Sequence, residues 1–148
     1  MTLQAIHKTI EINAPAEKVW QVLLEENHIR EWYKSFGEGV EAHTDWQLGS
    51  KAAFKDQKGN GIFGRIVQHI PNKAITIEYD GFLVEGQPDF ESEGAKAAKG
   101  SQESYTLQST PNGTVLVVDC EMDESYIDMM SAAWEKALEK IKQISEDL

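Results

Sequence analysis

Cysteine is almost absent from this sequence, since Cys120 is the only one in 148 residues. A lone thiol excludes an internal disulfide and a zinc site built on several cysteines. Four histidines are present, but their spacing does not match that of metal ligands: His7, His28, His43 and His69. We therefore predict no metal site. Cys120 lies among apolar residues on the predicted buried face of a strand, which is typical of a packed, unreactive thiol.

Positive charge is also scarce. The chain has 14 lysines and arginines against 25 aspartates and glutamates, a formal net charge of −11. Nucleic acids and anionic membrane surfaces both require clustered basic residues, so we predict no nucleic-acid partner and no stable membrane association. The sequence also lacks a membrane-spanning apolar run and the basic-then-apolar start of a signal peptide. These absences favour a cytoplasmic protein.

The remaining composition is that of an ordinary globular chain, with 41% hydrophobic and 26% charged residues. No repeat, linker or low-complexity segment interrupts it. A chain of this length buries a sizeable core as one domain. We therefore predict a single domain over residues 1–148.

The end of the chain, residues 123–148, carries the strongest pattern. Apolar residues recur there at spacings of three and four, which predicts one buried stripe on a long helix. The stripe comprises Tyr126, Met129, Met130, Ala133, Trp134, Ala137, Ile141, Ile144 and Leu148. Almost everything before this helix alternates as strands do, so we expect the helix to lie across an antiparallel sheet.

The preceding residues predict a strand, two short helices and then about six further strands. Pro15 favours the start of the first helix, and a second helix is expected at residues 29–34. The expected strands are residues 6–12, 40–46, 51–55, 62–70, 74–82, 104–109 and 114–122. Residues 86–100 break the pattern with glycine and proline and predict a mobile loop, with a helical turn at 93–99. We expect this loop to control access to any cavity.

Three short motifs carry a resemblance to a known family: residues 10–20 (IEINAPAEKVW), Trp32-Tyr33, and Gly113-Thr114 at the last strand. With the element order, they resemble the START-related helix-grip superfamily (SRPBCC), which includes the birch pollen allergen and bacterial polyketide cyclases. Within it, the chain is similar to the branch named for the C-terminal domain of the activator of heat-shock protein 90 ATPase. The resemblance covers nearly the whole chain.

This resemblance implies an α+β helix-grip fold. Its parts are a curved antiparallel sheet of about six or seven strands wrapped around a long C-terminal helix, and two short helices after the first strand. Members of the superfamily bind lipids, hormones or polyketides between sheet and helix, and some are enzymes. We expect a cavity here lined by large apolar side chains: Trp32, Tyr33, Trp46, Phe54, Phe63, Tyr79, Tyr105, Met122, Met129, Met130, Ala133 and Trp134. Polar groups in it are expected from Arg65, His69, Tyr79 or Tyr105.

Residues 59–64 (GNGIFG) match the dinucleotide fingerprint G-x-G-x-x-G letter for letter. That chemistry needs a helix whose N-terminus faces the pyrophosphate. The residues that follow favour a strand and are soon ended by Pro71, so we predict a hairpin turn and no nucleotide cofactor.

Three functions follow from these observations. The leading one is binding of a small hydrophobic or amphipathic ligand in the cavity, without covalent chemistry and with no assigned catalytic residue. The first alternative is a cyclase- or hydrolase-like enzyme acting on a hydrophobic substrate there, which convergent polar groups with perturbed pKa values would favour. The second alternative is a chaperone co-factor of the heat-shock protein 90 ATPase activator type; a protein partner is possible, but no other sequence feature supports one.

Overall fold

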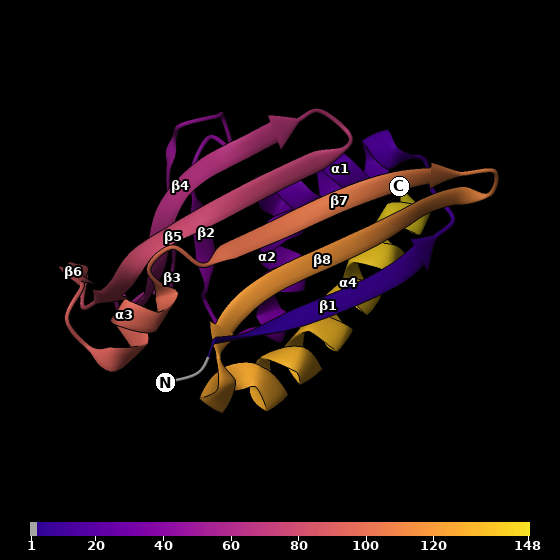
Figure 1. Cartoon of the computed structure of the whole chain (residues 1–148). Coiled ribbons are helices and arrows are strands. Elements are labelled where there is room, and N and C mark those ends of the chain that lie inside the picture. Colours follow the sequence, from indigo (N-terminus) through magenta and orange to yellow (C-terminus); the bar gives the residue numbers. More distant parts are fainter. Residues whose placement is uncertain (1–2) are drawn as a thin grey trace.

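The strands of this protein form one strongly curved sheet (Figure 1). The computed structural model describes residues 3–148, and within them eight strands pair antiparallel in the order β1-β8-β7-β5-β4-β3-β2, with β6 paired to β5. The strands are β1 Leu3–Ile12, β2 Glu41–His43, β3 Lys51–Lys55, β4 Gly61–Ile70, β5 Ala74–Val84, β6 Gln87–Asp89, β7 Gln102–Thr110 and β8 Gly113–Asp123.

The helices are α1 Ala16–Leu24, α2 Glu26–Trp32, α3 Glu93–Ala98 and α4 Ile127–Asp147, with short 3-10 turns at Tyr33–Ser35 and Glu124–Tyr126. Helices α1, α2 and α4 cover the same face of the sheet (Figure 1). The predicted helix-grip architecture is therefore confirmed. No helix within residues 3–148 is long and apolar enough to cross a membrane.

The sheet has one strand more than the six or seven expected, because the predicted loop contains the short strand β6. The helical turn predicted at 93–99 is present as α3. The strand predicted at 40–46 is shorter, since β2 covers only Glu41–His43. Trp46 has a positive φ of 63°, which a continuing strand does not allow.

The buried face of α4 differs from the predicted stripe. Its buried residues are Trp134, Ala137, Leu138, Ile141 and Ser145, so Leu138 was missed. Met129, by contrast, is 64% exposed. Tyr126 belongs to a 3-10 turn, which advances about 120° per residue instead of 100°. Met129 lies inside α4, five residues before Trp134, so at about 100° per residue it points about 140° away from that buried side chain.

The Gly59–Gly64 segment contains the end of the predicted hairpin turn between β3 and β4 and the first four residues of β4, and no helix starts there. The Asp56 carboxylate accepts hydrogen bonds from the backbone N–H groups of Lys58 and Asn60, at 2.9 and 3.0 Å. Gly59 adopts a φ of +85°, a backbone conformation that is strained for any residue with a side chain.

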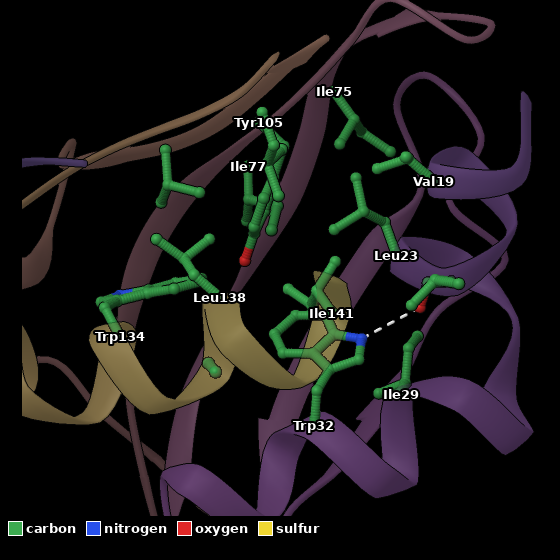
Figure 2. Packing of buried hydrophobic residues seen from close by; sticks show 14 of the residues in the cluster. Val19, Leu23, Ile29, Trp32, Ile75, Ile77, Tyr105, Trp134, Leu138 and Ile141 are labelled. Carbon is green, nitrogen blue, oxygen red and sulfur yellow. Dashed lines mark hydrogen bonds between the residues drawn. The ribbon is translucent and has the colours of Figure 1, made fainter. Parts of the chain in front are cut away.

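The core fills the space between the sheet and these helices (Figure 2). Trp32 donates its indole N–H to the carbonyl oxygen of Val22 at 2.9 Å, which fixes α2 against α1. Ile77 on β5 and Ile141 on α4 are fully buried in the same cluster. Two helices and the sheet thus share one apolar contact region, which holds α4 in place.

We expect Trp134→Ala to lower the free energy of unfolding by about 3–5 kcal/mol, the usual cost of truncating a buried tryptophan. Trp134 is 2% exposed and lies within 5.7 Å of Tyr105 and 4.9 Å of Phe36, centroid to centroid. The measurement is urea denaturation. Met129→Ala on the same helix is the control and should change stability by less than about 0.5 kcal/mol; equal losses would contradict this helix orientation.

Candidate functional site

Two adjoining cavities lie between the sheet and α4. The main cavity has a volume of about 220 Å³ and the side cavity about 130 Å³. The two share four lining residues: Ile62, Tyr79, Glu103 and Met130. These four side chains therefore lie at the boundary between the two cavities.

The main cavity gathers seven of the residues predicted to line it: Trp32, Tyr33, Phe54, Tyr79, Tyr105, Met130 and Trp134. These residues come from α2, the turn after it, β3, β5, β7 and α4. Sequence reasoning did not anticipate the other six lining residues, Phe36, Val40, Asn60, Gly61, Ile62 and Glu103. Met122, also predicted, lines the side cavity instead.

Four predicted lining residues lie elsewhere. Ile62 faces the main cavity, so its neighbour Phe63 projects from the opposite face of the strand. There the Phe63 ring packs against the Phe90 ring, with the two ring centroids 5.7 Å apart. Trp46 packs on Phe54 but borders a separate surface pocket. The other two, Met129 and Ala133, are absent from both linings because α4 is rotated relative to the predicted stripe.

Glu103 is the one charged residue in the main cavity. Strand β7 lies between β5 and β8, and Glu103 pairs with Ile77 on one side and Cys120 on the other. Strand alternation puts its side chain on the face that carries the buried Tyr105 and Leu107. A carboxylate on that face is the signal that sequence reasoning missed, because the strand was predicted to begin at residue 104, two residues after its actual start at Gln102.

Burial raises the pKa of the Glu103 carboxyl above its ordinary value of 4.5. Hydrogen bonds from Tyr105 and Tyr79 favour the ionised form and oppose this shift, but burial is the larger effect. The Tyr105 hydroxyl donates directly to Glu103. Glu103 is only partly buried, and it lines both cavities. The site therefore presents a carboxyl group that holds its proton more readily than a surface glutamate does.

Burial also raises the pKa values of the tyrosines around Glu103. Those of Tyr33, Tyr79 and Tyr105 lie well above 10.0, with the negative charge of Glu103 adding to the effect. Burial, with Glu103 as the second cause, raises the pKa of Cys120 to about 12. The hydroxyls are therefore neutral hydrogen-bonding groups, and Cys120 is buried, as predicted, with a thiol that stays protonated at neutral pH.

Two of the four predicted polar groups are not in either cavity. Arg65 forms ion pairs with Glu78 and Asp80, at 2.5 and 2.6 Å, on an exposed part of the sheet. The Nδ1 atom of His69 lies 2.7 Å from the carbonyl oxygen of Trp46, within hydrogen-bond distance. Among the described residues no group of three histidines, cysteines or acids is placed to hold a metal ion.

The segment expected to be a mobile loop packs more closely than predicted. In α3, Ala95 and Ala98 are buried, and the side chain of Ser92 caps the helix by accepting from the N–H of Ala95. Gly94 and Ala98 line the side cavity. Helix α3 therefore forms one wall of that cavity, and its role in ligand access stays a prediction.

A family model described as "Activator of Hsp90 ATPase homolog 1-like protein" matches residues 13–146 of the chain. A comparison of the chain with curated protein sequences found no match. The family match covers the first helices, the sheet from β2 onward and nearly all of α4. All residues that line either cavity lie within the matched range.

Solved structures with the same fold include the protein MLL2253 from Mesorhizobium loti, with a TM-score of 0.75, 18% sequence identity, and coverage of 95% of this chain and 96% of that one. The Aha1 dimer from Colwellia psychrerythraea has a TM-score of 0.69 and 19% identity, covering 97% and 96%. CalU16 from Micromonospora echinospora has a TM-score of 0.63 and 22% identity, covering 97% and 75%. These three are similar to the chain in fold.

We expect Glu103→Gln to stabilise the protein at neutral pH and to have little effect near pH 4. In the folded state the pKa of Glu103 is above 4.5, so as the pH rises the unfolded chain loses this proton before the folded protein does. The free energy of unfolding therefore falls as the pH rises from the pKa of Glu103 in the unfolded chain to its pKa in the folded protein. Each unit of elevation contributes about 1.4 kcal/mol. The glutamine side chain keeps an acceptor for the Tyr105 hydroxyl without the charge.

The measurement is the difference in free energy of unfolding between the two proteins, by urea denaturation from pH 4 to pH 8. Taking the difference cancels the titration of other acids, such as Glu146, whose pKa a hydrogen bond from Lys142 lowers. A difference that does not change with pH would show that burial leaves the Glu103 carboxyl unperturbed.

Proposed function

Because the chain belongs to the Activator of Hsp90 ATPase homolog 1-like family, whose helix-grip fold leaves space between sheet and helix, we propose that it binds a small hydrophobic or amphipathic ligand. The ligand occupies the main cavity and no covalent chemistry takes place. The observation that carries this proposal is the lining itself, in which seven of thirteen residues are aromatic and one is a carboxyl group. Such a surface offers apolar contact together with one fixed polar anchor.

Different lining residues supply the apolar contact and the polar contact. Trp32 and Trp134 lie 6.1 Å apart, centroid to centroid, and supply flat apolar surface from two different helices. Glu103 and Tyr105 supply hydrogen-bonding groups from the middle of the sheet. A ligand with an aromatic or branched apolar body and one polar group fits both parts.

We expect 2-phenylethanol, a neutral amphipathic probe, to bind in the main cavity. At ten times its dissociation constant it should stabilise the protein by about 1.4 kcal/mol, measured by thermal unfolding. Ile62→Trp should abolish this gain, because Ile62 lines both cavities and a larger side chain fills the space.

Ile70→Trp is the matched control for this experiment. Ile70 ends the same strand, β4, and is 44% exposed, so its enlargement should leave binding unchanged. Backbone amide shifts on adding the probe should concentrate in β7 and the first half of α4. No stabilisation by the probe, or the same stabilisation in Ile62→Trp, would count against a ligand cavity.

A second candidate function is acid–base catalysis on a hydrophobic substrate in the same cavity. The observation that favours it is the raised pKa of Glu103, next to the neutral hydroxyl of Tyr105. A carboxyl group with a raised pKa takes and returns a proton closer to neutral pH, and a hydroxyl donor stabilises developing negative charge. Glu103 would act as the general base toward water, and the Tyr105 hydroxyl would turn from Glu103 to donate to the carbonyl oxygen.

Hydrolysis of 4-nitrophenyl butyrate tests this second function. General base catalysis predicts that Glu103→Gln lowers kcat/KM by about 100-fold or more, and that the rate of the unaltered protein rises with pH as Glu103 ionises. Ester hydrolysis that is equal in both proteins, or absent from the unaltered one, would reject Glu103 as a base for this reaction.

A further inference from the structure

We propose that the ligand of the main cavity carries a positive charge, as an organic ammonium group attached to an apolar body, and that Glu103 is its counter-ion. This inference rests on the proposed binding function and names the chemical class of the ligand. Three independent observations support it: the charges that line the two cavities, the aromatic surfaces around Glu103, and the sign of the whole protein.

The charges around the cavities are all of one sign. Glu103 lines both cavities, and Glu121 and Asp123 also line the side cavity. No lysine, arginine or histidine among the described residues lines either cavity. Most buried carboxylates are paired with a cation from the protein, since an unpaired charge is costly to bury. Glu103 has only neutral hydroxyl donors, so its matching positive charge is absent from the protein side of the site.

The walls around Glu103 suit a cation for a second reason. Aromatic rings carry negative charge on their faces and attract ammonium groups within about 6 Å, most strongly where water is excluded. Tyr105 and Trp134 lie 5.7 Å apart, centroid to centroid, and Tyr105 contacts Glu103 directly. A ligand ammonium beside the carboxylate would therefore also meet aromatic rings. An anionic ligand would face repulsion from both groups.

The charge of the whole chain acts in the same direction. A net charge of −11 raises the local concentration of cations around the protein and lowers that of anions. This long-range effect is screened by salt and does not depend on any single residue. The contribution of Glu103 is local, so a distant acid serves as a matched control for it.

Three probes of similar size separate the possibilities: 2-phenylethylammonium, 2-phenylethanol and phenylacetate, which are cationic, neutral and anionic at pH 7.5. Affinities are measured by calorimetry on the full chain at 0.15 M salt. We expect the cation to bind at least 10-fold more tightly than the alcohol, and phenylacetate to bind more weakly than either. Ile62→Trp, which fills the cavity, should remove binding of all three.

Glu103→Gln should weaken binding of the cation at least 10-fold but that of the alcohol by no more than about 2-fold, because the glutamine amide removes the charge and keeps a hydrogen-bonding group for a neutral hydroxyl. Glu139→Gln, which removes an equal charge from an exposed position on α4, should leave both unchanged. Unfolding curves establish that each variant is folded before binding is measured. If the alcohol binds as well as the cation, or if Glu139→Gln has the effect of Glu103→Gln, the counter-ion role is wrong while the cavity still binds ligand. If no probe binds, both proposals fail.

Discussion

The burial of α4 against the concave face of the sheet is the contact on which the rest of this structure depends. Trp134, Ala137 and Ile141 are buried on this face of the helix, and α1 and α2 pack beside it. Because the sheet curves around the helix instead of lying flat on it, the two surfaces meet closely along part of their length and separate elsewhere. The cavities occupy the part where they separate, so the packing that stabilises the fold also shapes the candidate site.

Glu103 is the feature of that site that stability does not require. An apolar side chain at this position of β7 would avoid the cost of burying a carboxyl group, and the raised pKa of Glu103 reflects that cost. The neighbouring Tyr105 and Tyr79 reduce this cost without removing it. A group that is held in a costly environment by well-ordered neighbours is a reason to infer function, whether as a counter-ion for a ligand or as a base. A chaperone partner stays a prediction that rests on the family likeness alone.

The sequence predicted the fold well because each element has a strong local pattern. The order of strands and helices, the hairpin at Gly59–Gly64 and the long last helix all followed from periodicity and turn residues. The site was harder to predict. Phe63 and Ile62 are adjacent and both apolar, and alternation alone does not say which one faces inward. Met129 lies at the edge of the predicted stripe, about 140° around α4 from Trp134, and Glu103 was missed because its strand was predicted to begin two residues too late. Lining a cavity depends on such small offsets, whereas fold class does not.

The placement of the tryptophans has a practical consequence. Trp32 and Trp134 line the main cavity, while Trp20 stacks edge-on against His69 and Trp46 borders a different pocket. Indole fluorescence responds to the polarity of its immediate surroundings and to quenching by a neighbouring molecule. Two of the four tryptophans of this chain therefore lie where a molecule in the main cavity would touch them. Tryptophan fluorescence therefore reports on whether the main cavity is occupied. Unknown ligands in a metabolite extract can be screened with it, without a label.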